Sequence, residues 1–165
     1  MPPDDPSATT VRPIAPDDVP AVVDLSLRAW RPVFESFERV LGPEIYQRIY
    51  PDWLTSQAAA VRGTCDGPHV WVAATSQRPV GFVAVDVRGD DARSAEVDMI
   101  AVDPDHQRKG VATALITHAL DQLRSLGVAI ADIGTGGDPG HAAARRTYEK
   151  AGFTALPLVR YYKVL

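Results

Sequence analysis

The feature that most constrains this chain is a strand-like segment that passes through a polar turn directly into a long helix. Residues 96–102 alternate as a strand does, and in residues 110–126 apolar side chains recur at every fourth position. The two segments are joined by Gln107-Arg108-Lys109-Gly110-Val111-Ala112. A helix with one apolar face must bury it, and we expect it to lie on a sheet. The junction therefore predicts an α/β fold.

The start of this helix is suited to hold an anion. The first N–H groups of a helix lack intrahelical partners and lie at the positive end of its dipole, so a loop wrapped over them can bind a pyrophosphate. Gly110 permits close backbone approach, Ala112 leaves room for the anion, and Arg108 and Lys109 add positive charge. The alternative for these two basic residues is a solvated loop. A P-loop is excluded, because no Gly-Lys-Ser/Thr follows a glycine-started loop.

The rest of the chain supplies the other strands and helices. We expect strands at residues 10–14, 69–74, 80–87, 96–102, 128–133 and from 153 onward, with residues 88–94 as a hairpin turn. Helices are expected from Asp18, capped by Asp17, to just before Pro32, and at residues 43–61, 110–126 and 141–150. Residues 1–9, rich in Pro, Asp and Ser, are expected to be disordered, which leaves 10–165 as a single domain.

Composition narrows the function classes. The chain of 165 residues is 45% hydrophobic and 23% charged, as is usual for a globular domain. Its formal net charge of −4 lacks the basic excess of nucleic-acid-binding proteins, and its apolar runs are too short to span a bilayer. The first residues carry no basic-then-apolar signal, and Cys65 is the only cysteine. We expect a cytoplasmic protein without nucleic-acid, membrane or metal partners, and we allow for a homodimer.

The junction resembles the Q-x-x-G-x-G/A pyrophosphate loop of the GNAT superfamily of acetyl-CoA-dependent N-acetyltransferases, here at residues 107–112. The run Tyr148-Glu149-Lys150-Ala151-Gly152-Phe153 and the order of the elements resemble the same family. The resemblance implies a mixed, mostly antiparallel central sheet flanked by helices. Because only residues 153–165 remain after this run, the family's final hairpin is expected to be short or absent. The implied reaction is direct attack of a primary amine on acetyl-CoA in a ternary complex.

The resemblance also implies which residues bind the coenzyme and which act on it. The main chain of Ile100 and Val102 would bind the acyl end and the pantetheine amides, with the Ile100 N–H also stabilising the oxyanion. Tyr148 would protonate the leaving thiolate, or else it is a half-buried packing residue. The pyrophosphate would be held by Gln107, Arg108, Lys109, Gly110, Val111, Ala112 and Thr113. His141 stands where many relatives carry a coenzyme-binding asparagine. Coenzyme contact, helix capping and proton shuttling stay open for it.

A base is needed because an alkyl amine, with a pKa of about 10, arrives mainly as ammonium. Glu96 and Asp98 lie two residues apart on one strand and so face the same side. By resemblance Glu96 occupies the position of a glutamate general base. The alternatives are that Asp98 or water takes the proton, while the acids line a wet cavity or pair with basic side chains.

The acceptor is not fixed by the sequence: a small amine, a peptide N-terminus and a lysine side chain are all open. Asp138, in the loop of residues 134–140, could attract a cationic amine, whereas Arg145 and Arg146 are expected on a solvated face. One alternative function is a non-catalytic acyl-CoA-binding regulatory module, against which Glu96 and Tyr148 argue. A dinucleotide-dependent oxidoreductase is weaker, because Pro139 stands where the third glycine of its fingerprint belongs.

Overall fold

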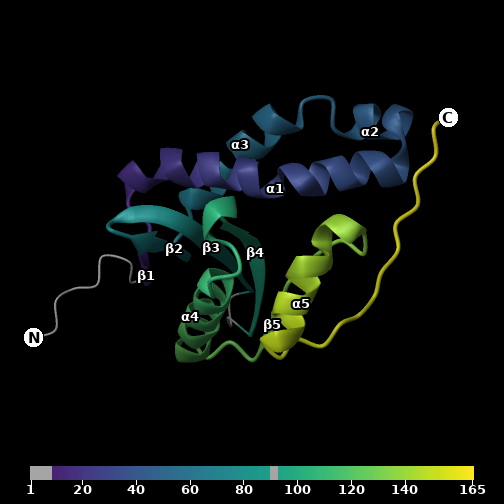
Figure 1. The fold of residues 1–165 in the computed structure, drawn as a ribbon. Coiled ribbons are helices and arrows are strands. Elements are labelled where there is room, and N and C mark those ends of the chain that lie inside the picture. The colour runs from purple at the N-terminus through teal and green to yellow at the C-terminus, as the bar shows by residue number, and fades with distance from the viewer. Residues whose placement is uncertain (1–8, 90–92) are drawn as a thin grey trace, which may run out of the picture.

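A computed structural model describes residues 9–89 and 93–165, which form one five-stranded sheet with helices on both faces (Figure 1). The strand order is β1-β2-β3-β4-β5. The pairs β1–β2, β2–β3 and β3–β4 are antiparallel, whereas β5 is parallel to β4. The expected mixed, mostly antiparallel sheet is confirmed. The strands are β1 (Thr9–Pro13), β2 (Val70–Thr75), β3 (Arg78–Arg88), β4 (Ser94–Val102) and β5 (Ile130–Asp132).

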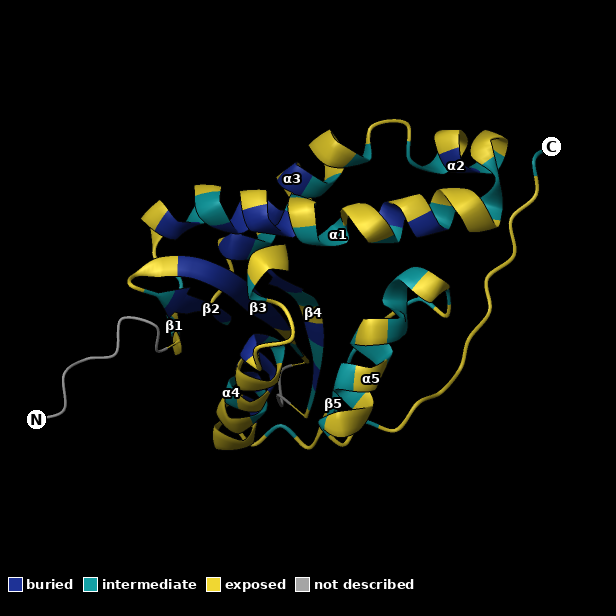
Figure 2. Cartoon of the chain, in the orientation of Figure 1, coloured by how far each residue is buried: buried dark blue, intermediate teal, exposed yellow. Residues whose placement is uncertain are grey.

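The helices divide between the two faces and one end of the sheet. They are α1 (Val19–Leu41), α2 (Pro43–Ile49), α3 (Trp53–Cys65), α4 (Val111–Ser125) and α5 (Ala142–Lys150). One core lies between the sheet and α1 with α3, and a second lies between the sheet and α4. Figure 2 shows the buried residues gathered at these two interfaces. Gly81 of β3 permits the close approach of α4, because a Cβ there would stand 3.1 Å from Val111 and Leu115 side-chain atoms.

The predicted end of the first helix before Pro32 is wrong, since α1 continues through it to Leu41. A proline inside a helix removes one backbone hydrogen bond, which here is offset by packing. Beyond Pro32, Phe34 is buried and stacks on Trp53 of α3, with 4.2 Å between the ring centroids. Contacts distant in sequence thus override the local signal to stop.

Two other helix boundaries also differ from prediction. The expected cap Asp17 lies inside a 3-10 turn, and Asp18 instead occupies the N-cap position of α1. The expected helix at residues 43–61 is divided into α2 and α3, because Asp52 starts a new helix by accepting the N–H of Thr55 at 3.2 Å. The expected hairpin turn is only partly seen: β3 and β4 are antiparallel neighbours, but residues 90–92 lie outside the described residues. So do residues 1–8 of the segment expected to be disordered.

The terminal strand predicted from residue 153 is wrong. Residues 153–165 have no regular secondary structure and run as an extended tail from α5 toward α2 (Figure 1). Pro157 cannot donate to a sheet, and the neighbouring β5 is only three residues long. Residues 153–165 therefore form no closing hairpin, in line with the expectation that it would be short or absent. In the part of the chain that the structure describes, no helix has both the length and the apolar character to cross a bilayer.

Candidate active site

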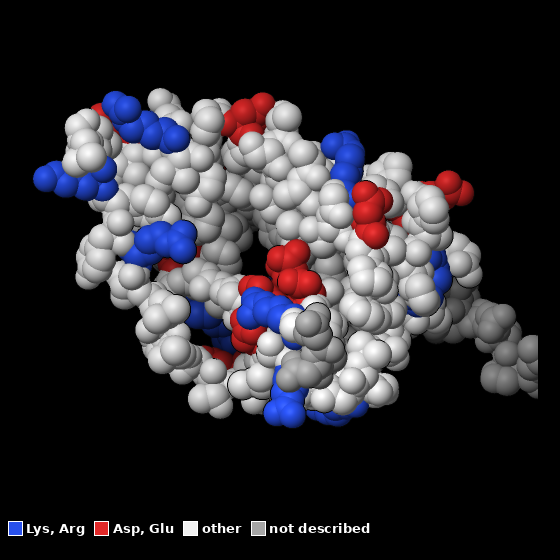
Figure 3. Space-filling model, turned by 180° about the vertical axis from the view of Figure 1, so that it is seen from behind, with Lys and Arg blue, Asp and Glu red and all other residues white. Residues whose placement is uncertain are grey.

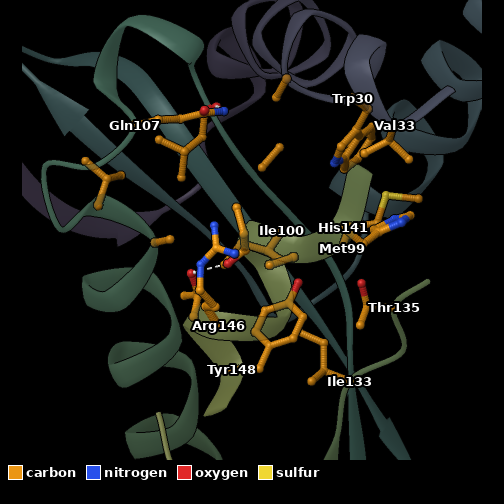
Figure 4. Close-up of a pocket in the computed structure, with 18 of the residues that line it drawn as sticks. Trp30, Val33, Met99, Ile100, Gln107, Ile133, Thr135, His141, Arg146 and Tyr148 are labelled. Atoms are coloured by element: carbon orange, nitrogen blue, oxygen red, sulfur yellow. Dashed lines mark hydrogen bonds between the residues drawn. The ribbon is translucent and has the colours of Figure 1, made fainter. Parts of the chain in front are cut away.

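A large cleft opens where β4 and β5 separate. β5 pairs with β4 only at Ser94, Ala95 and Glu96, so among the described residues no strand lies beside β4 from Val97 to Val102 on that side. The cleft has a volume of about 860 Å³, within the usual range for small-molecule sites. It is bounded by β4, the loop into α4, α1, α5 and the residues after β5 (Figure 4). Seen from behind, acidic and basic side chains gather around a hollow in this face (Figure 3).

The main chain of β4 faces the cleft at alternate residues. Asp103 donates its N–H to the Val80 carbonyl of β3 at 2.8 Å. Because successive residues of a strand point their N–H and C=O groups to opposite sides, those of Ile100 and Val102 point away from β3. They therefore face the side from which β5 has withdrawn. The Val102 carbonyl accepts one hydrogen bond, from Gln107 Nε2 at 3.1 Å, and keeps a second lone pair.

Internal hydrogen bonds fix the loop between β4 and α4. Asp103 is buried, accepts the Asp105 N–H at 2.9 Å and pairs with Arg28 of α1. Burial alone would raise the pKa of Asp103, but the Asp105 N–H and the Arg28 guanidinium hold that pKa below its usual value. Lys109 Nζ donates to the Asp105 carbonyl at 2.9 Å. The loop thus ties the sheet to α1 while it leads into α4.

The N-terminus of α4 opens onto the cleft. Gly110 is its N-cap, with φ +82, a left-handed conformation that a side chain would strain. No atom lies within 4 Å of the place where a Cβ would stand, so this backbone is accessible to a ligand. The predicted loop residues that line the cleft are Gln107, Arg108, Gly110, Val111, Ala112 and Thr113. Lys109 does not line it, since its ammonium group binds the Asp105 carbonyl.

Tyr148 lies on the opposite side of the cleft, on α5, with its hydroxyl directed into the cleft below Ile100 (Figure 4). Its ring packs edge-on against Phe153, 6.3 Å away between centroids. Burial raises the pKa of Tyr148 to about 12, so the hydroxyl is protonated at neutral pH. A protonated hydroxyl thus lies across the cleft from the main chain of β4.

The two acids of β4 have separate surroundings. Asp98 lines the cleft and lies 3.4 Å from the Thr64 hydroxyl of α3. It is the extra residue of a β-bulge, because β3 pairs Ala84 with Met99 and then Val85 with Val97. Glu96 does not line the cleft, and its carboxylate forms an ion pair with Arg88 of β3. Of the two acids, the structure brings Asp98 and not Glu96 to the cleft.

Of the two α5 arginines expected on a solvated face, one departs from it and the other stays exposed. Arg145 donates to the carbonyls of Gly136 at 2.6 Å and Asp138 at 2.8 Å, which fastens the loop after β5 to the helix. Arg146 is exposed but lines the cleft, and its side chain reaches toward Ile100 (Figure 4). A helical pattern places both on a polar face, and only the position of the neighbouring loop separates their roles.

The loop after β5 holds a cluster that the sequence did not predict. His141 lines the cleft, and the carboxylate of Asp138 binds both His141 Nδ1 and the hydroxyl of Ser36 on α1. The sequence allowed Asp138 to attract a cationic amine, but in the structure its oxygens are engaged by these neighbours. Nothing in the sequence marks Ser36, because a serine within a helix has no distinctive signal. Across the same cleft, Trp30 of α1 contributes its aromatic ring to the lining.

Comparisons with known proteins agree with this geometry. A family model for the acetyltransferase (GNAT) family matches residues 28–153. An uncharacterised N-acetyltransferase of Methanocaldococcus jannaschii is 26% identical over 155 residues, covering 92% of this chain and 63% of that relative's length. The chain thus spans less than two thirds of that protein.

Solved structures show the same fold. The ribosomal-protein-S18-alanine N-acetyltransferase from Escherichia coli superposes with a TM-score of 0.65 at 23% identity, over 91% of this chain and 80% of that one. The PaiA N-acetyltransferase from Thermoplasma acidophilum, solved with coenzyme A, gives 0.66 at 12% identity over 89% and 90%. With a family model that covers most of its length and a fold shared with these enzymes, the chain belongs to the GNAT acetyltransferase family.

Proposed function

We propose that this protein transfers an acetyl group from acetyl-CoA to a primary amine by direct attack within a ternary complex. The observation that carries the proposal is that one cleft joins three features: the N-terminus of α4, the free main chain of β4 and the hydroxyl of Tyr148. Direct transfer needs an anion site for the coenzyme, a donor for the oxyanion and an acid for the thiolate, and these features can supply them.

The coenzyme would bind along β4 and across the start of α4. Its pyrophosphate suits the first N–H groups of α4 near Gly110, with Arg108 adding charge. Its pantetheine amides suit the outward main chain of Ile100 and Val102, in the manner of an added strand. Lys109 would contribute less to coenzyme binding, because its ammonium group already binds a carbonyl within the loop. The coenzyme A complex of the fold relative from T. acidophilum supports this use of the fold.

Bond exchange would take place between Ile100 and Tyr148. The Ile100 N–H would stabilise the oxyanion as the amine adds to the thioester carbon, and the Tyr148 hydroxyl would donate to the departing sulfur. Full transfer from a phenol of pKa about 12 to a thiolate of pKa ~8.5 is uphill by roughly 5 kcal/mol. Proton donation must therefore accompany C–S cleavage and cannot precede it.

The sequence leaves three candidates for the group that accepts the amine proton: Glu96, Asp98 and water. Glu96 remains the prediction from family resemblance, but its carboxylate is paired with Arg88 and does not line the cleft. Asp98 reaches the cleft, where it would attract a cationic amine. A carboxylate of ordinary pKa, about 4, is too weak to deprotonate an ammonium group unaided.

The acceptor class is a small-molecule amine or a peptide amine. Enzymes that match over part of this chain or share its fold act on both kinds: one is named for an alanine of a ribosomal protein, and another is an aminoglycoside N-acetyltransferase. The aromatic ring of Trp30 and the carboxylate of Asp98 line the side of the cleft left for an acceptor. A cytoplasmic location and a homodimer stay predictions, the latter testable by analytical ultracentrifugation.

Two measurements test the proposal. Acetyl-CoA should raise the melting temperature by mass action, and pantetheine, which lacks the pyrophosphate, should raise it far less. A panel of small amines and peptides, followed by thiol release from acetyl-CoA, should then give turnover with some of them. Equal melting temperatures with and without millimolar acetyl-CoA would exclude the coenzyme site. Binding without turnover on any amine would favour the acyl-CoA-binding regulatory module.

A further inference from the structure

A histidine, an aspartate and a serine from distant parts of the chain form one hydrogen-bonded chain beside the cleft. His141 Nδ1 lies 2.5 Å from Asp138 Oδ1, and the Ser36 hydroxyl donates to Asp138 Oδ2 at 2.6 Å. The Gly140 N–H donates to the Ser36 oxygen and to Asp138 Oδ2, both at 3.0 Å. Ser36 is only 1% exposed, which shows that α1 is packed against this loop.

Two glycines make room for this arrangement. A Cβ at Gly136 would overlap Asp138 Oδ1 and stand 2.5 Å from His141 Nδ1. A Cβ at Gly140 would stand 2.7 Å from the Ser36 Cβ. By contrast, nothing lies within 4 Å of a Cβ at the neighbouring Gly137. Side chains at the first two positions would break the cluster, so the loop sequence is matched to it.

The geometry determines which nitrogen of His141 faces the cleft. Burial alone would raise the pKa of Asp138, but hydrogen bonds from Ser36, His141 and the Gly140 N–H together hold that pKa below its usual value. The ionised carboxylate must receive a proton from Nδ1, which leaves the Nε2 lone pair of a neutral ring available. His141 lines the cleft near Met99 and below Trp30 (Figure 4). This is the arrangement in which an aspartate orients a histidine base.

We propose that His141 Nε2 accepts the proton of the acceptor amine, directly or through one water, with Asp138 and Ser36 as positioning residues. The inference rests on the proposed acetyl transfer. One ammonium proton passes to His141 and then to solvent. The free amine forms the C–N bond and the C–S bond breaks. Tyr148 gives its proton to the departing sulfur, and the second proton lost by the nitrogen restores the Tyr148 hydroxyl. The imidazolium is stabilised by the Asp138 carboxylate.

The groups near His141 come from its own loop, α1, α5 and β4. On the loop that contains His141, Asp138 carries the acidic charge next to the ring. From α1 come the neutral Ser36 hydroxyl and the Phe37 ring, whose centroid lies 5.5 Å from that of the His141 ring. From α5, Arg145 binds the Asp138 carbonyl, and Arg146 and the Tyr148 hydroxyl line the same cleft. From β4, the Asp98 carboxylate lines it as well. The nearest charged partner of the ring is thus the Asp138 carboxylate, at Nδ1.

The first test is independent of turnover. In protein labelled with 15N-histidine, NMR of the neutral His141 ring should show the proton on Nδ1. Asp138→Asn should shift the tautomer toward Nε2–H, and so should Gly136→Ala, whereas Gly137→Ala should leave it unchanged. An Nε2–H tautomer in the parent protein, or the same tautomer in all four proteins, would overturn the assignment.

The second test uses the pH dependence of turnover with an amine found in the panel, at saturating acetyl-CoA. His141→Asn supplies the asparagine amide in place of a base, so coenzyme affinity should hold while turnover at neutral pH falls about 10²-fold or more. The loss should shrink at high pH, where the free amine needs no base. Asp138→Asn should lower turnover less than His141→Asn does, and Ser36→Ala should lower it less again, because both residues act through His141.

Two outcomes separate this inference from the proposed function. In the first outcome, the parent protein acetylates an amine, and His141→Asn keeps the parent's pH profile and only weakens acetyl-CoA binding. His141 is then a coenzyme contact, and the proton role is wrong. If the parent protein acetylates no amine in the panel, the proposed transfer fails, and the proton role fails with it. An Asp138-oriented ring seen by NMR would then be structural alone.

Discussion

The two walls of the cleft are built in different ways. In the wall of β4, the loop and α4, the proposed contacts with the coenzyme come from one continuous stretch, residues 100–113, and mainly from backbone atoms. In the facing wall, Ser36 of α1 meets Asp138 across 102 positions of sequence, and side chains supply the contacts. α4 contributes the buried Leu115, Ile116 and Ala119 to the core, whereas α5 contains no buried residue.

This difference separates two tasks of a transferase. Backbone groups on a rigid strand and helix are suited to hold a common cosubstrate, because their positions depend little on neighbouring side chains. Side chains held by polar bonds on a lightly packed helix are suited to proton transfer and acceptor choice, where single substitutions can change the chemistry. Variants of the first wall should therefore change coenzyme affinity, and variants of the second should change turnover.

The largest effect is expected in the second wall, at Tyr148. Tyr148→Phe keeps the ring that packs on Phe153 and removes only the hydroxyl, so coenzyme affinity should hold while turnover falls about 10²- to 10⁴-fold. Single-turnover rates together with calorimetric binding of coenzyme A measure the two quantities. A loss of coenzyme affinity with an unchanged chemical rate would assign Tyr148 to coenzyme binding, like the first wall, and would contradict the proposed division of tasks between the two walls.

A smaller effect is expected in the first wall, at Gly110. Gly110→Val places a β-branched residue at φ +82, which costs about 1–3 kcal/mol of strain and narrows the anion site, so coenzyme affinity should fall about 10- to 100-fold. Gly127, at the other end of α4, has φ +77 and equally open surroundings. Gly127→Val should therefore cost similar stability and leave calorimetric affinity unchanged. Equal affinity losses in the two variants would show that the helix start has no special role.

Glu96 lies beside the cleft wall rather than in it, and a modest effect is expected there. Because its carboxylate pairs with Arg88 and does not line the cleft, Glu96→Gln should lower turnover less than about tenfold, with the pH profile retained. The family resemblance predicts a loss of about 10²-fold that shrinks at high pH, as for a general base. Asp98→Asn is the control on the same strand. The pH–rate profiles of the two variants decide between Glu96, Asp98 and His141.

The smallest effect concerns the buried aspartate of each wall. The pKa values of Asp103 and Asp138 are both lowered on folding, so each stabilises the fold fully above the ordinary aspartate pKa near 4, and that stability is lost as pH falls through the lowered value. Asp138→Asn should lower the free energy of unfolding at pH 7 and lower it far less at strongly acidic pH, where the carboxyl group of the parent protein is protonated. Urea unfolding at both pH values measures this. Asp103→Asn should show the same pH trend, but without the change in the pH profile of turnover.

Local sequence was sufficient for the first wall. The strand, the turn and the helix from Gly110 were predicted within a residue or two, because alternation, a helix start and a left-handed glycine are properties of neighbouring residues. The continuation of α1 through Pro32 and the loss of the terminal strand could not be predicted in this way. They depend on packing against Trp53 and on the short β5, which local propensity does not contain.

The sequence by itself determined the family fold and the helix start that can hold an anion. It also identified two polar groups close to one another, Tyr148 on α5 and His141 just before that helix. Tertiary structure alone decided that Glu96 pairs with Arg88 outside the cleft while Asp98 and Arg146 line it. It alone also brought Ser36 to Asp138 and so oriented His141. The physical reason is that backbone geometry is set by adjacent residues, whereas the partner of a side chain is set by whichever distant element packs beside it.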